Sequence, residues 1–356
     1  MILIYKEIIN YCLELGIEPW VTLYHWDLPQ KLEEHGGWTN RRIINWFENY
    51  TEVCVHHFGD RVKNWMVANE PLAFTGAGYF LGVHAPGRRG LKNFLPAMHH
   101  AILAIAQSAR AIRNSEFELR VGTTFSCSLI EPASSSSWDI KAAERIDALM
   151  NRLFIEPLTG SGYPVRTLKF LRKLEKYILP GDKELMHFEW DFIGLQNYTR
   201  EIVRHSFLTP YLQAALVPAR KRRVPTTAMG WEVYPAALSQ MIRKFQPYTL
   251  RADLIITENG AAFQDVVSES DQIDDTLRTA FIEQSLKEVL KAKQAGLKVD
   301  GYFVWSLTDN FEWIEGYNPR FGLVHIDFET QKRRIKQSGH WYKNFLKKAS
   351  DHTPSP

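Results

Sequence analysis

The sequence predicts an α/β fold, an incomplete barrel of the (β/α)8 TIM-barrel type that has about six of the eight βα units and lacks the first two strands. Two observations favour this fold. Short apolar runs alternate with longer runs of helical spacing, which predicts a parallel sheet with right-handed crossovers. Two of the apolar runs end in a glutamate, Glu70 and Glu258, and a parallel barrel gathers its strand ends on one face.

The chain opens in a predicted helix. Ile4, Ile8, Ile9, Cys12 and Leu13 recur at helical spacing, and the glycine at position 16 is a typical helix end. Further helices are expected at about residues 40–58, 95–114, 140–153, 234–245, 274–294 and 339–348. Strands are expected at residues 17–24, 64–67, 120–125, 191–198, around 254 and at 301–307, and residues 162–179 have a mixed pattern.

Six strands are two fewer than a closed barrel of this class needs. Because a βαβ unit takes roughly 30 residues or more, we expect on the order of 60 residues or somewhat more before Met1. The chain has no short-period repeat and no linker rich in Gly and Pro, so a single domain is predicted over residues 1–356.

Charge and hydropathy exclude several classes of partner. Lysine and arginine number 43 against 40 acidic residues, and a net charge of +3 gives no strong field for nucleic acid or an anionic membrane. No run of 18 or more apolar residues occurs, as a membrane-spanning helix would require. We therefore expect neither a nucleic acid nor a membrane partner.

The three cysteines predict no covalent or metal framework. Cys12, Cys54 and Cys127 are odd in number, widely spaced and without a C-x-x-C pair, so buried free thiols in a reducing compartment are expected. The first residues show neither a basic segment nor a small-residue cleavage site of a secretory signal. These features predict a cytoplasmic location.

Aromatic residues are abundant, at 13% with 11 Trp and 14 Tyr. Apolar ring faces stack on the C–H faces of sugars, so the excess is compatible with carbohydrate binding. A core rich in tryptophan explains the same composition equally well.

The two glutamates suggest a chemical pair. A lone Thr-Glu-Asn-Gly after the apolar run ending at Ile256 is more often a solvated strand end, but Asn69-Glu70-Pro71 repeats the pattern 258 − 70 = 188 residues earlier. Cleavage of a glycosidic bond needs one carboxylic acid to protonate the leaving oxygen and one carboxylate at the anomeric carbon. Two carboxylates on neighbouring strand ends of one barrel would meet this need.

An ordered set of motifs carries a family resemblance. The motifs are Leu23-Tyr-His-Trp-Asp-Leu-Pro29, Asn69-Glu70-Pro71, His84-Ala-Pro-Gly87, Thr257-Glu258-Asn259-Gly260 and Trp305-Ser-Leu-Thr-Asp-Asn-Phe-Glu-Trp313. Together they resemble the β-glucosidases of glycoside hydrolase family 1, over essentially the whole chain.

The resemblance implies the catalytic roles. Glu70 matches the general acid/base and Glu258 the nucleophile of a retaining double displacement, with the carboxyl groups about 5 to 5.5 Å apart. Asn69 matches the residue that binds the sugar 2-hydroxyl, and Tyr198 matches the tyrosine that holds an oxygen of the nucleophile. The family chemistry needs no cofactor and no metal.

The resemblance also implies the sugar contacts. His25 and Trp26 match contacts on the O3 side, Trp305 the platform under the ring, Glu312 the carboxylate bridging O4 and O6, and Trp313 a further donor to O3 or O4. Outside this motif set, His25 and Trp305 would be read as core residues. A glutamate at 312 favours an unphosphorylated sugar, so the expected substrate is a small-molecule or oligosaccharide β-glycoside, with glucose, galactose and fucose left open.

One departure from the family opens an alternative. The family's first two strands carry a glutamine that grips O3 and O4 and an arginine that orients the nucleophile, and no matching motif occurs here. Two open sheet edges would favour a homo-oligomer. A catalytically impaired or inactive remnant, acting as a glycan-binding or interaction module, is therefore the alternative to an active β-glucosidase.

Overall fold

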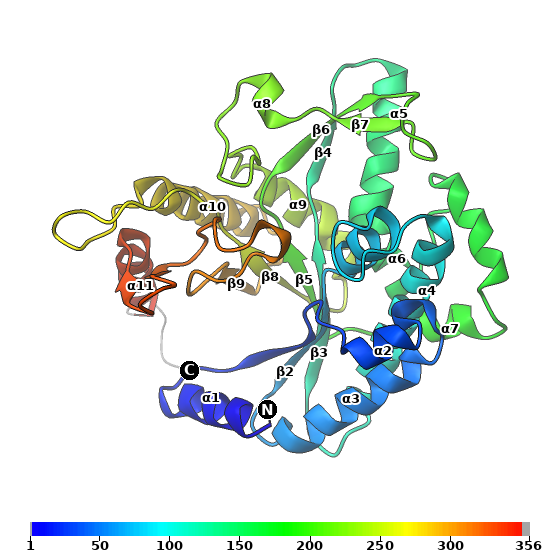
Figure 1. Ribbon diagram of the computed structural model, residues 1–356, viewed down its shortest axis with the longest axis horizontal. Helices are drawn as coiled ribbons and strands as arrows, with labels where there is room; N and C mark the ends of the chain where they lie inside the picture. The colour runs from blue at the N-terminus through cyan, green and yellow to red at the C-terminus, as the bar shows by residue number, and fades with distance from the viewer. Residues whose placement is uncertain (1, 351–356) are drawn as a thin grey trace.

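One parallel sheet forms the centre of the computed structural model, which describes residues 2–350 (Figure 1). Its strands are, in spatial order, β1 (Trp20–Tyr24), β2 (Asn64–Asn69), β3 (Arg120–Ser126), β5 (Phe192–Gln196), β8 (Asp253–Asn259) and β9 (Gly301–Val304), and every pair is parallel. The strand order in the sheet follows the chain order, as successive βα crossovers produce. The six predicted strands and the α/β class are thus confirmed.

The predicted helices are present and surround the sheet (Figure 1). They are α1 (Ile2–Glu14), α3 (Ile43–Phe58), α4 (Leu91–Arg113), α5 (Ser137–Asp147), α9 (Ala237–Phe245), α10 (Thr276–Gln294) and α11 (Gln337–Ser350). A π-helical turn, η3 (Ala148–Arg152), extends α5, and the mixed segment contains the 3₁₀ helix η4 (Lys169–Lys176). The single-domain prediction also includes residues 1 and 351–356, which lie outside the described residues.

Several short elements were not predicted. These are the helices α2 (Gln30–Glu34), η1 (Gly37–Thr39), η2 (Ala73–Leu81), α6 (Ile155–Leu158), α7 (Asp182–Met186), α8 (Ala219–Arg222), η5 (Gln246–Tyr248) and η6 (Trp313–Glu315). A three-stranded sheet joins β4 (Leu129–Pro132), β6 (Arg200–His205) and β7 (Ala214–Leu216), and β10 (Val324–Ile326) pairs with β11 (Arg333–Ile335). Because β4 follows β3 and β6 follows β5 directly, this small sheet extends the structure beyond the carboxyl ends of the main strands.

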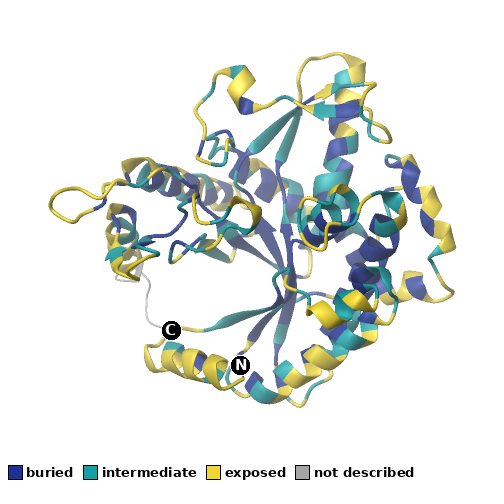
Figure 2. Cartoon of the chain, viewed as in Figure 1, coloured by how far each residue is buried: buried dark blue, intermediate teal, exposed yellow. Residues whose placement is uncertain are grey.

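The inner strands of the central sheet, β2, β3, β5 and β8, are deeply buried, as their dark blue colour in Figure 2 shows. Leu254 and Ile256 have no exposed surface and Ile255 retains 3%, so β8 is buried on both faces as its apolar run predicts. The ends of β8 and β9 approach so closely that a Cβ added to Gly260 would lie 2.1 Å from the carbonyl oxygen of Trp305. Only glycine fits there.

The outer edges of the sheet differ from its centre. Within residues 2–350, β1 pairs only with β2 and β9 only with β8. Helix α1 lies beside β1 and is largely exposed (Figure 2). Of its apolar residues at helical spacing, Ile9 is buried, whereas Ile4 and Ile8 are 60% and 53% exposed.

The cysteines lie partly in the core and partly on the outer helices. All three cysteines are free thiols, as expected, but only Cys127 is buried, while Cys12 and Cys54 are half-buried on the outer helices α1 and α3. No helix within residues 2–350 combines the length and the apolar character needed to cross a membrane.

Candidate active site

A cavity of about 310 Å³ opens at the carboxyl ends of the main strands. All nine residues singled out from the sequence line it: His25, Trp26, Asn69, Glu70, Tyr198, Glu258, Trp305, Glu312 and Trp313. They come from the ends of β1, β2, β5, β8 and β9 and from the segment after β9. In parallel barrels this face holds the catalytic groups, because the strand-to-helix loops there vary independently of the core.

Glu70 follows the last residue of β2 in a backbone conformation that is unusual for glutamate. Its φ angle is +47°, its N–H donates to the carbonyl of Thr124 (3.1 Å), and its own carbonyl accepts from the N–H of Ala73 (2.8 Å). Pro71 comes next and cannot continue the strand ladder, so the chain turns into η2. These contacts turn the Glu70 side chain, which is only 9% exposed, toward the cavity.

Left-handed backbone recurs among the cavity residues. Trp26 and Trp313 have φ angles of +79° and +47°. Such conformations cost on the order of 1–3 kcal/mol each in non-glycine residues and persist where the surrounding structure determines them. Three strained residues that face one cavity indicate a functional site.

Glu258 lies near the end of β8, where its oxygen Oε2 accepts a hydrogen bond of 2.6 Å from the Tyr198 hydroxyl. Burial, and then the charges of Glu258 and Glu70, raise the pKa of Tyr198 well above its ordinary value, so the phenol stays protonated and acts as a donor. A hydrogen bond to a carboxylate favours its charged form. Tyr198 therefore stabilises the Glu258 anion.

The two glutamates are electrostatically coupled. Burial raises the pKa of Glu70 to about 7, and the charge of Glu312 adds to this while a hydrogen bond from Ser126 opposes it. Burial and then the charge of Glu70 raise the pKa of Glu258, against the Tyr198 hydrogen bond. Two neighbouring buried carboxyls cannot both ionise easily, so the pair shares one proton near neutral pH.

A chain of hydrogen bonds runs beside Glu70. Gln196 donates from Nε2 to Oδ1 of Asn69 (2.7 Å), and Asn69 donates from Nδ2 to Nε2 of His25 (3.1 Å). The indole N–H of Trp26 donates to the Asn69 carbonyl (3.0 Å). Burial lowers the pKa of His25 to about 4, against the opposing charge of Asp27, so its imidazole is neutral at neutral pH. These bonds fix the Asn69 amide next to Glu70.

Aromatic rings form one wall of the cavity. The His25 ring stacks near Trp305 and Trp313, with centroid distances of 5.8 and 6.1 Å, and Trp26 lies 4.8 Å from Trp313. Such rings present an apolar face together with an N–H donor. The wall therefore suits a ligand with C–H faces and hydroxyl edges.

Glu312 is the third carboxyl group of the cavity. It precedes η6, and its backbone N–H donates to the carbonyl of Gly316 (2.7 Å). Burial raises the pKa of the Glu312 carboxyl, a hydrogen bond from Trp305 opposes the shift, and the charge of Glu315 adds to it. Trp305, Trp313 and this carboxyl thus come from the same segment after β9.

The family model of glycosyl hydrolase family 1 matches residues 2–350. The chain belongs to this family. Among the relatives of this family 1 chain is β-glucosidase A of Thermotoga maritima, which is 40% identical over 344 residues, covering 96% of this chain and 76% of the relative. Another is β-glucosidase 42 of Arabidopsis thaliana, 36% identical over 369 residues, covering 96% of this chain and 74% of the relative. The family 1 chain is therefore a glycoside hydrolase.

Solved structures of family members superpose on it. The Thermotoga maritima β-glucosidase in complex with deoxynojirimycin has a TM-score of 0.92 at 40% identity, and the match covers 97% of this chain and 77% of the solved chain. The AHE enzyme of Alicyclobacillus herbarius has a TM-score of 0.94 at 32% identity, and the match covers 98% of this chain and 78% of the AHE chain. The barrel class predicted for this family 1 chain is confirmed.

Sequence reasoning missed some residues of the site. Gln196 is completely buried and orients Asn69, while Ser126 hydrogen-bonds Glu70 from the end of β3. Trp231 packs 5.3 Å from the Tyr198 ring, and Glu201 lines the cavity from β6. The position of Gln196 at the end of an apolar strand was a usable signal. Trp231 and Glu201 lie on irregular or unpredicted segments, where no periodic pattern indicates which way a side chain points.

The described part of this family 1 chain contains no group of three or more His, Cys, Asp or Glu side chains arranged to hold a metal ion.

Proposed function

We propose that this chain hydrolyses terminal β-D-glucosides, or related β-glycosides, with retention of configuration. The observation that carries the proposal is that the Glu70 and Glu258 carboxyls face one cavity from the ends of β2 and β8, where the charge of Glu70, after burial, raises the pKa of Glu258. The names of relatives such as β-glucosidase A support glucosides as the substrate class.

In the proposed first step, Glu70 donates its proton to the glycosidic oxygen as Glu258 attacks the anomeric carbon. The C–O bond to the leaving group breaks, and an ester forms between the sugar and Glu258. The hydrogen bond from Tyr198 supports this role, because it favours the Glu258 anion against the effects of burial and of the Glu70 charge, which raise the pKa of Glu258. Consumption of the Glu258 charge then lowers the pKa of Glu70.

In the proposed second step, Glu70 acts as a base. It takes a proton from water, the hydroxide attacks the anomeric carbon, and the ester bond to Glu258 breaks. Two inversions give net retention. Both groups return to their starting protonation states.

Recognition of the sugar is proposed for the remaining cavity residues. Asn69 would bind the 2-hydroxyl, His25, Trp26 and Trp313 the O3 and O4 side, and Glu312 would bridge O4 and O6 above the Trp305 platform. The neutral state of His25 and the fixed Asn69 amide support these contacts, because both present oriented hydrogen-bonding groups. The negative charge of Glu312 would repel a 6-phosphate, which supports an unphosphorylated sugar.

The test is hydrolysis of a chromogenic aryl β-glucoside by the purified chain, with Glu258→Gln as a near-isosteric control. We expect turnover that the substitution abolishes, and an initial product of β configuration by NMR. A folded chain without turnover that still binds glucosides would instead support the non-catalytic glycan-binding alternative. An initial α product would contradict retention.

We further propose that the chain forms homo-oligomers through the edges of its central sheet and works as a single domain in the cytoplasm. Within residues 2–350 the edge strands β1 and β9 each pair with one neighbour only, and α1 adds exposed apolar side chains. Three free thiols suit a reducing compartment. Cell fractionation with antibody detection tests the location.

A further inference from the structure

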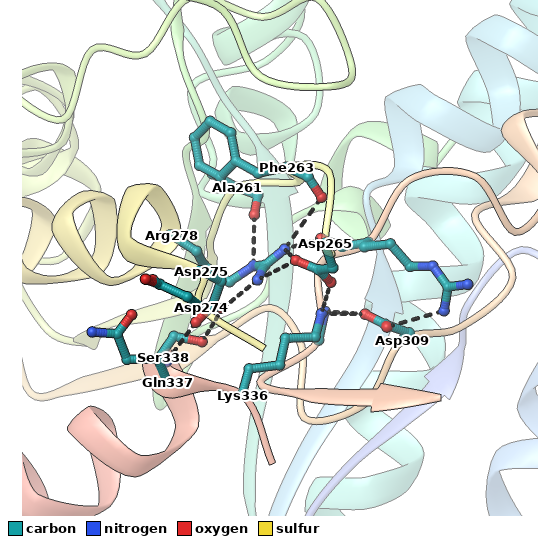
Figure 3. Close-up of polar contacts among 12 residues, drawn as sticks. Ala261, Phe263, Asp265, Asp274, Asp275, Arg278, Asp309, Lys336, Gln337 and Ser338 are labelled. Atoms are coloured by element: carbon teal, nitrogen blue, oxygen red, sulfur yellow. Dashed lines mark hydrogen bonds and ion pairs between the residues drawn. The ribbon is translucent and has the colours of Figure 1, made fainter. Parts of the chain in front are cut away.

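A buried network of charged side chains joins the segments that follow β8, β9 and β11 to helix α10 (Figure 3). It joins three carboxylates, Asp265, Asp275 and Asp309, to three cations, Arg278, Arg320 and Lys336. All except Arg320 have side chains that are at most 1% exposed. Charges this deeply buried are expensive unless each is paired, and here the opposite charges are equal in number.

Lys336, just after β11, joins two segments that are distant in sequence. Its Nζ donates to Oδ1 of Asp309 (2.8 Å), in the segment after β9, and pairs with Oδ2 of Asp265, in the segment after β8. Asp309 is held further by the N–H of Gly322 (2.9 Å) and by the Arg320 guanidinium (3.1 Å). Lys336 thus links the segment that follows Glu258 at the end of β8 to the segment that supplies Glu312 and Trp313 to the cavity.

Arg278, on α10, binds the segment after β8 directly. Its Nε donates to the carbonyl of Ala261 (3.2 Å), and both terminal nitrogens donate to Oδ1 of Asp265 (3.0 Å each). It also binds Asp275 and the carbonyl of Arg320. Ala261 is three residues beyond Glu258, so one end of the network is fixed close to that glutamate.

The other end of the network is close to the sugar-facing wall. In the chain, Asp309 lies between Trp305 and Glu312, and Trp313 comes directly after Glu312. Residues 309–319 contain no α-helix or β-strand, only the short η6, so few backbone hydrogen bonds hold Glu312 in place. The side-chain contacts of Asp309 therefore form a large part of the attachment of this segment.

We propose that Lys336 is a positioning residue, which sets Glu312 and Trp313 relative to Glu258 through its ion pairs with Asp309 and Asp265. The inference rests on the proposed function, since it concerns the sugar that these residues would hold. Misplacement of a binding group by about 1 Å can reduce a rate about 100-fold, even when the substituted residue lies far from the chemistry.

The experiment compares two substrates in the variants Lys336→Met and Asp265→Asn. An aryl β-xyloside lacks the C6 hydroxymethyl group that Glu312 would contact, whereas the matching aryl β-glucoside carries it. We expect kcat/KM for the glucoside to fall at least about 10-fold more than that for the xyloside. Asp265→Asn conserves the side-chain volume. If Lys336→Met does not fold, the ratio of the two kcat/KM values is measured in Asp265→Asn instead.

The matched control is Asp182→Asn. Asp182 is an equally buried carboxylate, 1% exposed, that pairs with Arg41 and His99 away from the cavity. The Asp182→Asn substitution should lower the melting temperature and leave the ratio of kcat/KM for the glucoside to that for the xyloside unchanged. A ratio that is likewise unchanged in the Lys336 and Asp265 variants would overturn the positioning role and leave a purely structural network.

Binding separates this proposal from the proposed function. Titration calorimetry with deoxynojirimycin, the ligand of the solved Thermotoga maritima relative, needs no turnover. If the wild-type chain binds this compound without hydrolysing glucosides, the proposed function fails but the positioning role is still measured. At least about 10-fold weaker binding in Lys336→Met than in Asp182→Asn supports the role, and equal binding contradicts it.

Discussion

The hydroxyl of Tyr198 donates a 2.6 Å hydrogen bond to Oε2 of Glu258, and both side chains are partly buried at the end of the central sheet. Hydrogen bonds to charged groups contribute about 1.5–3 kcal/mol. We expect Tyr198→Phe to reduce kcat/KM about 10- to 100-fold and to move the acidic limb of the pH profile upward, because Glu258 loses a partner that favours its anion. An unshifted acidic limb would mean that Tyr198 does not act on Glu258.

The shared proton predicts a bell-shaped dependence of kcat/KM on pH. Activity should fall as pH rises through about 7, because Glu70 then loses the proton that it donates. It should also fall at acidic pH, where Glu258 takes up a proton.

Glu70→Gln tests this assignment. The variant should lose the basic limb and hydrolyse substrates with poor leaving groups very slowly. With dinitrophenyl β-glucoside, which needs little acid assistance, added azide should restore turnover and give a β-glycosyl azide. Formation of an α-azide would contradict Glu258 as the nucleophile.

The raised pKa of Glu70 also predicts a stability change. Burial moves it from an ordinary 4.5 to about 7, so the folded state binds a proton that the unfolded state releases. The free energy of unfolding should therefore decrease as pH rises from about 4.5 to 7, by on the order of 3 kcal/mol. Glu70→Gln should raise the melting temperature at pH 8 and much less at pH 4.5. Calorimetric curves that shift equally at both values would contradict this origin.

Asn69 predicts a dependence on the substrate 2-hydroxyl. In Asn69→Ala, kcat/KM for an aryl β-glucoside should fall about 10- to 100-fold, since a hydrogen bond at the transition state is lost. The 2-deoxyglucoside lacks that hydroxyl, so its kcat/KM should change little. Equal losses for both substrates would instead indicate that Asn69 supports Glu70 or His25.

The exposed face of α1 predicts self-association. Ile4 and Ile8 are more than half exposed beside the edge strand β1. Light scattering after size-exclusion chromatography should show a mass that increases with concentration, and Ile4→Glu with Ile8→Glu should reduce it. Leu250→Glu, at an 87% exposed residue outside the sheet, is the matched control. A monomer at all concentrations would refute association.

The repeating part of the fold was predictable from the sequence because it obeys simple periodicities. Leu254 to Ile256 form an uninterrupted apolar run, and the structure buries them on both faces. Strand β6 was missed because Arg200 and Glu201 begin it, and its pairing with β4 depends on a neighbour 71 residues away, Leu129 with Arg200. Such pairing is a tertiary effect that local pattern does not encode.

The candidate site shows the same limit. Motifs placed Glu70 and Glu258 on strand ends, and the parallel sheet brings both to one cavity. The buried network around Lys336 was not foreseen, since each of its charges resembles a solvated one in sequence. Its pairs join positions from Asp265 to Lys336 that only the folded loops bring together.

The close approach of Gly260 to the Trp305 carbonyl has a consequence for variation of this gene. Since even a single methyl group would collide there, codon 260 should be nearly invariant in a saturation library selected for glucoside hydrolysis, although glycine offers a substrate no side chain. Its neighbour Ala261, also fully buried, has a Cβ already accommodated by the packing. A methyl-sized side chain should therefore be rejected at codon 260 and accepted at codon 261.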